Sequence, residues 1–253
     1  MARLSSGNRI NSASDDAAGV AIASRLTADI RGTDQAIRNA LDGQALLDTA
    51  EGAHKEIENI LQRMREVSVQ AGNDTNNQQD RDNLQAELNA LSAEIDRIAG
   101  TTTWAGADLM EDATTTFSFQ VGAATGAKNQ ISVTIATMNA TGLGVGDGTV
   151  SVIDVETSGA TANAGTALID AAIEDVNIQR SELGAVSNRL NHTVNNLTNI
   201  SSNLSAAKGG IEDADFALET TNLAKNQILQ QASTAMLAQA NASKQNVLSL
   251  LQG

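Results

Sequence analysis

The sequence contains no proline and no cysteine, and aromatic residues make up only 2% of its 253 residues. Proline breaks helix interiors at a cost of about 3 kcal/mol, so its absence favours long uninterrupted helices. Without cysteine the chain has neither disulfides nor a thiolate nucleophile. A wide core normally uses large rings to fill its volume, whereas the Ala, Leu, Ile and Val of this chain suit narrow seams between helices.

Positive charge is also scarce, because 16 Lys and Arg stand against 30 Asp and Glu, a formal net charge of -14. This excess opposes binding to nucleic acid and to anionic membranes, which both favour a basic surface. No apolar run approaches the roughly 20 residues of a membrane span, and the N-terminus lacks the apolar core of a signal peptide. We therefore expect no nucleic-acid binding, no membrane insertion, and no export through a cleaved signal peptide.

Apolar residues recur at helical spacing in two segments of the first hundred residues. A seam from Leu46 to Ala71 predicts one helix, with Ser12 or Ser14 as its N-cap. A turn follows at 71–80. The heptad spacing from Leu84 to Ile98 then predicts a second helix over 79–99, which Gly100 would close.

Two further helices are expected in the C-terminal part of the chain. The third runs from about residue 166 to 208 and ends at Gly209-Gly210, since adjacent glycines favour a break. The fourth follows to the chain end, with Asp213 as its cap. It carries many apolar side chains and needs a partner for them. The apolar residues singled out for this role are Leu223, Ile228, Leu229, Met236, Leu237, Val247, Leu250 and Leu251.

Between these helices, residues 101–165 are rich in Gly and Thr and poor in charge. Apolar residues alternate with polar ones over 117–121 and again over 131–135, which predicts a β-hairpin. A weaker third strand is expected over 150–155. The fold class is therefore mainly α: a long antiparallel helical bundle or coiled-coil rod with a small β-hairpin subregion at one end.

The residues offer no catalytic set. The two histidines, His54 on a helical seam and His192 beside one, are most simply packed or exposed. No G-x-S-x-G elbow, Walker A loop or dinucleotide fingerprint occurs, and the Gly-rich loop at 142–150 lacks the spacing of an EF-hand. We expect no enzyme, no cofactor and no metal site. Charged residues between 63 and 94 form either a solvated face or a protein-contact patch.

Three stretches resemble bacterial flagellin. RLSSGNRINSASDDAAGVAIASRL (3–26) is similar to the family's N-terminal signature, LQRMREVSVQAGNDTN (61–76) to its LQR-x-RELAVQ segment, and 181–253 to its C-terminal signature almost throughout. The resemblance implies a flagellar filament subunit, self-assembling for motility, in five parts. These are an irregular connector (1–14), N-terminal outer-core helices (15–100), a β-hairpin region with a vestigial variable segment (101–165), a C-terminal outer-core helix (166–208) and a C-terminal inner-core helix (209–253).

The resemblance also implies partners and a location. Other flagellin subunits, an export chaperone, and filament cap and hook-junction proteins are expected, in an extracellular flagellum. The alternative is a surface-exposed binding protein on the same scaffold, an adhesin or a ligand of the Toll-like receptor that senses flagellin. The receptor or protofilament contacts would fall on Arg63, Val67 and Glu87. Val67 stands where the family usually has Leu, and the lost methylene is expected to weaken contact by about 1 kcal/mol.

One departure from the family pattern concerns the N-terminus. Flagellins usually carry a few tens of residues before the RLSSG motif, whereas Met1-Ala2 precede it here. The simplest interpretation is a truncated chain whose terminal helix lacks its usual partner. On that interpretation we expect the chain not to form normal filaments.

Overall fold

The structure, a computed structural model, describes residues 2–111, 114–147 and 151–251, with side chains for 3–111, 114–147 and 151–241. The chain divides into two compact units. One is Gly32–Asn199, and the other combines Met1–Arg31 with Ile200–Gly253. Two long helices, α2 (Ala17–Ala71) and α4 (Gly159–Glu212), contribute to both units.

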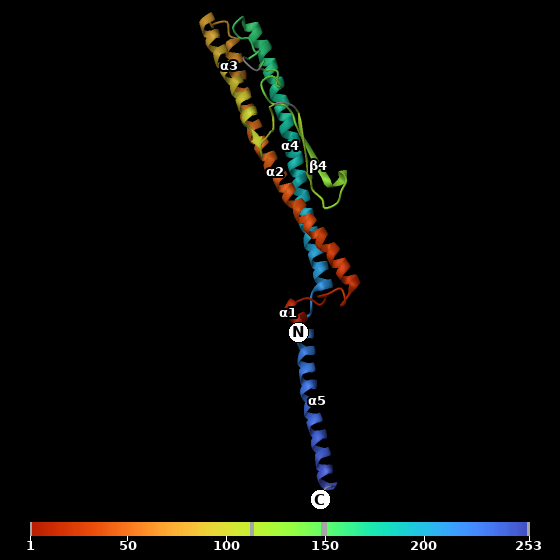
Figure 1. The fold of residues 1–253 in the computed structure, drawn as a ribbon. Helices are drawn as coiled ribbons and strands as arrows, with labels where there is room; N and C mark the ends of the chain where they lie inside the picture. The colour runs from red at the N-terminus through yellow and green to blue at the C-terminus, as the bar shows by residue number, and fades with distance from the viewer. Residues whose placement is uncertain (1, 112–113, 148–150, 252–253) are drawn as a thin grey trace. The chain divides into compact units, whose positions relative to one another are not determined.

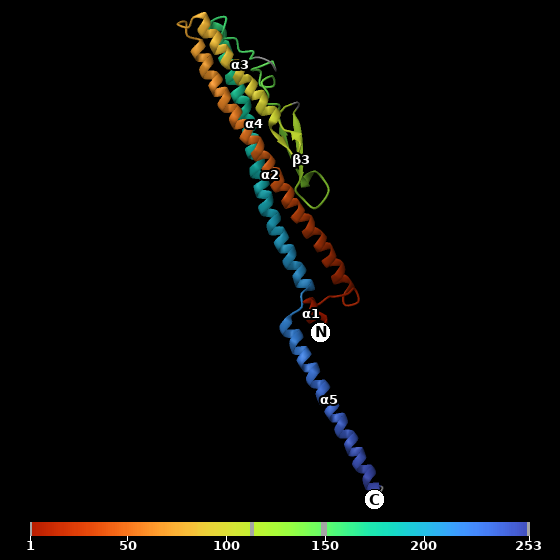
Figure 2. The ribbon, with the colours of Figure 1, turned by 60° about the vertical axis from the view of Figure 1, so that its left-hand side comes forward.

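Within Gly32–Asn199, parts of α2 and α4 pack with α3 (Gln78–Thr101), and both ribbon views show α3 beside the other two helices (Figures 1 and 2). α2 and α4 are antiparallel, since Ser68 bonds to Ala162 whereas Glu58 pairs with Arg180. Leu, Ile and Met fill the seam, as the heptad spacing predicts, so the mainly helical fold class is confirmed. Its largest fully buried helical side chains are Leu47, Ile57, Leu61, Met64, Leu88, Ile95, Ile169 and Leu183.

The predicted β-hairpin is present in the same unit. β3 (Thr115–Gln120) and β4 (Gln130–Ile135) pair antiparallel with Phe117 opposite Val133, and the short 3-10 helix η1 (Ala127–Asn129) lies in their connection. The hairpin lies along α2 and α4 (Figures 1 and 2), and side chains of both helices bind its backbone. Asn39 Nδ2 donates to Gln120 O at 3.0 Å and Gln179 Nε2 to Thr134 O at 3.0 Å.

Two features of the region after α3 were not predicted correctly. A second small ladder joins β1 (Thr103–Trp104) to β2 (Ala107–Asp108) through Ala105 and Gly106, both with positive φ. The third strand expected over 150–155 is wrong for the described residues, because Ser151 forms only one isolated bridge, with Gly146. Val150 lies outside the described residues.

Polar side chains of α3 explain why the described residues of this segment, 136–147 and 151–155, need no strand. Gln85 Oε1 accepts from Val155 N at 2.9 Å, and Asn89 Oδ1 accepts from Ser151 N at 3.1 Å. Asp96 Oδ1 accepts from Ala140 N at 2.8 Å. Buried backbone groups must find partners. Here the helix supplies them, so this irregular segment is held against α3 without a sheet.

Three helix ends differ from the sequence predictions. Gly100 lies inside α3, which continues to Thr101. α4 begins at Gly159 rather than near 166, because Ser158 caps it: Ser158 Oγ accepts from Thr161 N at 3.2 Å. α4 also passes through Gly209-Gly210 to Glu212. Glycine weakens a helix interior without forbidding it. The chain leaves the helix only where residue 213 pairs with another segment.

That other segment is the N-terminus, in the unit of Met1–Arg31 and Ile200–Gly253. The first residues, expected to be irregular, form the short helix α1 (Ala2–Ser6). Asn8 then pairs antiparallel with Asp213. Two backbone bonds flank this bridge, Arg9 N to Glu212 O at 2.6 Å and Ala214 N to Gly7 O at 2.9 Å. The turn between α4 and the last helix, α5 (Phe216–Leu251), is thereby tied to the start of the chain.

Aspartates provide the caps in this unit. Asp16 Oδ1 accepts from Gly19 N at 2.9 Å and begins α2, a role predicted for Ser12 or Ser14. Asp215 Oδ1 accepts from Ala217 N at 2.9 Å and begins α5, a role predicted for Asp213. An aspartate oxygen at an N-cap satisfies free amide groups and complements the helix dipole.

Candidate protein-contact surfaces

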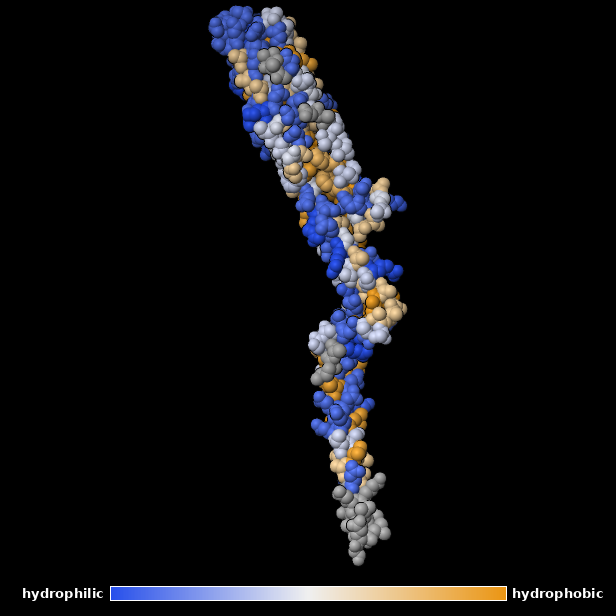
Figure 3. Space-filling model, in the orientation of Figure 1, coloured by the Kyte–Doolittle hydropathy of each residue, from blue (hydrophilic) through white to orange (hydrophobic). Residues whose placement is uncertain are grey.

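The C-terminal helix α5 exposes most of its described apolar side chains. Ile228, Leu229, Met236 and Leu237 are all exposed, Met236 by 74%, while Leu223 is partly buried. On the face seen in Figure 3, apolar residues of α5 are interspersed with hydrophilic ones. The side chains of Val247, Leu250 and Leu251 lie outside what the structure describes. The predicted apolar surface is therefore present in the described part of α5, and solvent covers it.

Local sequence explains why this stretch forms a helix although few of the described residues pack against it. The Asp215 cap starts it, and no Gly or Pro interrupts it before its end. Leu229 and Met236 are seven residues apart, two helical turns, and so share one face. Burying one such side chain stabilises a contact by about 1.5–3 kcal/mol. The apolar side chains of α5 thus contribute this free energy only when a partner covers them.

A second candidate surface lies on α2 and α3. Arg63 Nε donates to Glu87 Oε1 at 2.9 Å, and its Nη1 donates to Glu66 Oε2 at 3.0 Å. These bonds raise the pKa of Arg63 above its ordinary value, that to Glu66 most. The arginine side chain is 51% exposed. Exposed ion pairs contribute only about 0–1 kcal/mol to stability, so this pair remains available to other proteins.

The structure does not place Val67 in that exposed patch. Its side chain is fully buried in the core of α2, α3 and α4, although Arg63 is one helical turn away. Residues four apart are neighbours on a helix surface, but here the boundary between the exposed and the buried face of α2 passes between Arg63 and Val67. The expectation that Val67 contributes a surface contact is therefore corrected. Any effect of its missing methylene would act through packing.

The other charged residues of this region have separate roles. Arg65 Nε pairs with Asp170 of α4 at 2.6 Å, a partner 105 residues away. Arg81 is buried and binds carbonyl oxygens at the end of α2. Nothing in the local sequence indicates either partner, because both depend on how helices pack. The expected charged cluster is divided between a surface pair, an interhelical pair and a buried cap.

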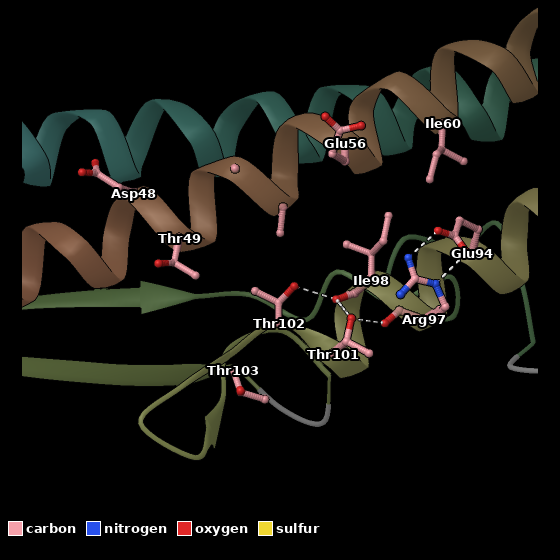
Figure 4. Close-up of a pocket in the computed structure, with 12 residues that line it drawn as sticks. Asp48, Thr49, Glu56, Ile60, Glu94, Arg97, Ile98, Thr101, Thr102 and Thr103 are labelled. Atoms are coloured by element: carbon pink, nitrogen blue, oxygen red, sulfur yellow. Dashed lines mark hydrogen bonds and ion pairs between the residues drawn. The ribbon is translucent and has the colours of Figure 1, made fainter.

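A groove of about 750 Å³ opens between α2 and the end of α3 (Figure 4). Its apolar residues include Ala53, Ile60 and Ile98, while Asp48 and Glu56 place carboxylates at its edge. Glu94 at the groove pairs with Arg97 at 2.6 Å, and the hydrogen bond from that arginine lowers the pKa of Glu94. An apolar floor with a charged edge is a surface suited to contact with another protein.

No group of three or more His, Cys, Asp or Glu side chains among the described residues is arranged to hold a metal ion. None of the described helices combines the length and apolar character that crossing a bilayer requires.

Comparison with known proteins gives the same family at both ends of the chain. Residues 1–115 match the family model for the bacterial flagellin N-terminal helical region, and 166–251 match that for the C-terminal helical region. The chain is 45% identical to a flagellin of Halalkalibacterium halodurans over 252 residues, covering 100% of this chain and 90% of that protein. It is 44% identical to a flagellin of Bacillus subtilis over 280 residues, covering 100% and 91%.

Solved structures agree with the fold. A Bacillus cereus flagellin crystal structure aligns with a TM-score of 0.53 and 33% identity, covering 68% of this chain and 94% of that one. A putative flagellar hook-associated protein from Vibrio parahaemolyticus aligns with a TM-score of 0.65, covering 79% and 100%. Its identity is 17%, so it supports the fold alone.

Proposed function

The chain belongs to the bacterial flagellin family and is a structural subunit of the extracellular flagellar filament, and we propose that α5 provides its principal assembly contact. The exposed apolar side chains of α5 carry this proposal, because a free subunit gains nothing from exposing them. In this scheme 209–253 serve as the inner-core segment, and 15–100 with 166–208 serve as the outer core, joined by the hairpin region 101–165.

Co-assembly with a second flagellin that forms filaments tests the role of α5. In the variant Leu229→Ser/Met236→Ser, we expect incorporation into mixed filaments to fall about 100-fold or more. The variant lacks two apolar side chains that are exposed in the free subunit and would be buried in the filament. The matched control Gln230→Ser/Gln231→Ser changes polar neighbours on the same helix. Sedimentation and electron microscopy measure the incorporated fraction. Equal incorporation of the two variants would refute the proposal.

The same apolar surface supports a second proposed partner, an export chaperone. An amphipathic helix is recognised when its apolar residues enter a hydrophobic groove, and such binding would cover α5 before assembly. We propose export by the flagellar route, and expect filament cap and hook-junction proteins to meet the subunit outside the cell. The contact between α5 and the chaperone would be tested by competition between the chaperone and an antibody against α5 for binding to the free chain.

Recognition by a Toll-like receptor is a further candidate role, favoured by the exposure of Arg63 and Glu87. Both residues lie at positions where the resemblance implies receptor contact, and each carries a charge-assisted hydrogen bond that a receptor could share. Arg63→Ala is expected to weaken receptor binding about 10- to 100-fold. Arg97→Ala, which removes another exposed arginine pair, is the control. Unchanged binding by the Arg63 variant would count against the patch.

A further inference from the structure

His54 is a titratable side chain in the middle of the helical core. It lies on α2 within Gly32–Asn199 and is fully buried. Its Nδ1 lies 2.6 Å from the carbonyl oxygen of Ala50. A carbonyl only accepts hydrogen bonds, so Nδ1 carries the ring proton and Nε2 is left as an acceptor. Nε2 has no hydrogen-bond partner among the described residues.

The charged groups around the ring act on a second proton in opposite directions, Arg180 against it and Glu51 in its favour. The positive charge of Arg180, on α4, disfavours protonation of His54. Arg180 also pairs with two carboxylates of α2, Glu58 in direct contact and Glu51 at 3.8 Å. A guanidinium offers only N–H donors, so it cannot accept a proton from Nε2–H. Lys55, the next residue on α2, is exposed. At this level α3 carries Glu94 and Arg97, which pair with each other.

We propose that His54 is a pH-sensitive position, here called the latch, in the packing of α2 against α4. This packing is stable while the buried ring is neutral and loosens when the ring is protonated in mild acid. Protonation would place a second cation beside Arg180 and leave a buried N–H without an acceptor, and such groups are costly. Glu51 favours the charged ring, but Glu51 and Glu58 both pair with Arg180, and neither accepts a hydrogen bond from Nε2. In a filament subunit with this latch, the packing of α2 against α4 would be stable at neutral pH and less stable in acidic surroundings.

The direction of the pH effect follows from linkage. Burial is the largest influence and lowers the pKa of His54 below its ordinary value of 6.5. The bond to Ala50 raises this pKa, Arg180 lowers it, and Glu51 raises it to a smaller extent. The unfolded chain therefore binds the proton first as pH falls. The contribution of neutral His54 to the free energy of unfolding is complete above about pH 7.5. It is lost as the pH falls through the pKa that His54 has in the unfolded chain. Below that value, each pH unit raises the ratio of unfolded to folded chain by up to about tenfold, until the folded state also takes up the proton.

The chain has only two histidines, which makes the test specific. Urea unfolding would be measured between pH 7.5 and 5.0 for the parent, His54→Gln, His54→Phe and the control His192→Gln. His192 is exposed on α4. We expect the parent and His192→Gln to lose stability together toward pH 5, and the His54 variants to lose this dependence. The same pH dependence in all four proteins would overturn the proposal.

A measurement on the parent chain covers the case in which His54 variants do not fold. Proton NMR resolves the ring signals of the two histidines, and His192→Gln assigns them. We expect the His54 signal to titrate at lower pH than the unfolded-state value of about 6.5, together with loss of native signals from α2 and α4. Titration of His54 at or above that value with native signals unchanged would rule out the latch.

Discussion

At the scale of single residues, Arg81 provides the C-terminal cap of a helix to which it does not belong. From α3 its Nη1 donates to Ala71 O at 2.5 Å, and its Nη2 donates to Asn73 O at 3.4 Å. The last carbonyls of a helix have no partner within it, and the guanidinium satisfies them where α2 ends. The side chain is only 9% exposed, so water could not replace it.

Replacing Arg81 by Met should therefore lower the free energy of unfolding by about 1.5–3 kcal/mol, the range for hydrogen bonds to charged groups. Arg97→Met is the control, because Arg97 makes an exposed pair with Glu94 and should change stability by about 0.5 kcal/mol or less. Urea unfolding measures both. Equal losses in the two variants would show that charge, rather than the cap, is responsible.

Two glycines of α4 differ in what surrounds them. A Cβ added at Gly165 would approach Ile153 Cγ2 within 2.3 Å, whereas one at Gly184 meets nothing within 4 Å. We expect Gly165→Ala to cost about 1–3 kcal/mol through overpacking, and Gly184→Ala to stabilise the helix by about 0.5–1 kcal/mol. Thermal unfolding would show melting temperatures moving in opposite directions. A shift of both in one direction would contradict this account of the two sites.

At the scale of elements, α5 differs from the other long helices in what holds it. α2, α3 and α4 bury Leu, Ile and Met along shared seams, whereas α5 has mostly its own backbone bonds and the cap at Asp215. Isolated helices are marginal in water, because most helical stability in proteins comes from packing. α5, which exposes its apolar side chains, is thus the long helix that packing stabilises least in the free chain.

Hydrogen exchange on the free chain should reveal this difference. We expect amides over 216–241 to exchange at least about 100-fold faster than those over 54–67 of α2, since local opening of α5 exposes little new apolar surface. Mass spectrometry of pepsin fragments would measure both segments in one experiment, and α3 serves as an internal reference. Comparable protection of α5 and α2 would mean that contacts other than those described stabilise the last helix.

At the scale of the whole molecule, a net charge of -14 opposes contact between copies of the chain. Long-range repulsion between like-charged subunits slows encounter, and salt screens it. Apolar contacts through α5 do not depend on salt in this way. Assembly therefore combines a short-range attraction with a long-range repulsion, and their balance depends on the medium.

Addition of subunits to filament ends should accordingly become faster as ionic strength rises from about 10 to 150 mM, where the Debye length falls from about 30 to 8 Å. Light scattering during co-assembly with a second flagellin that forms filaments measures the rate. Sucrose at equal osmolarity, which adds no ions, is the control. A rate that falls with salt would show that opposite charges, rather than apolar side chains, dominate the contact.

Local patterns predicted much of this protein. The heptad spacing of leucines and isoleucines, the absence of proline and the alternation over 117–121 and 131–135 predicted the helices and the hairpin, because side-chain periodicity and backbone preferences act over a few residues. The signatures at both ends identified the flagellin family, which the comparisons confirm. The apolar character of α5 was visible for the same reason.

Tertiary structure decided what depends on segments far apart in the chain. Val67 became a core residue, Arg65 found Asp170, and Gln85 and Asn89 took up backbone groups of 151–155 in place of a third strand. α4 continued through Gly209-Gly210 because the chain turns where Asp213 meets Asn8. Each partner is chosen by packing and by the need to satisfy buried polar groups, and neither requirement can be evaluated from neighbouring residues alone.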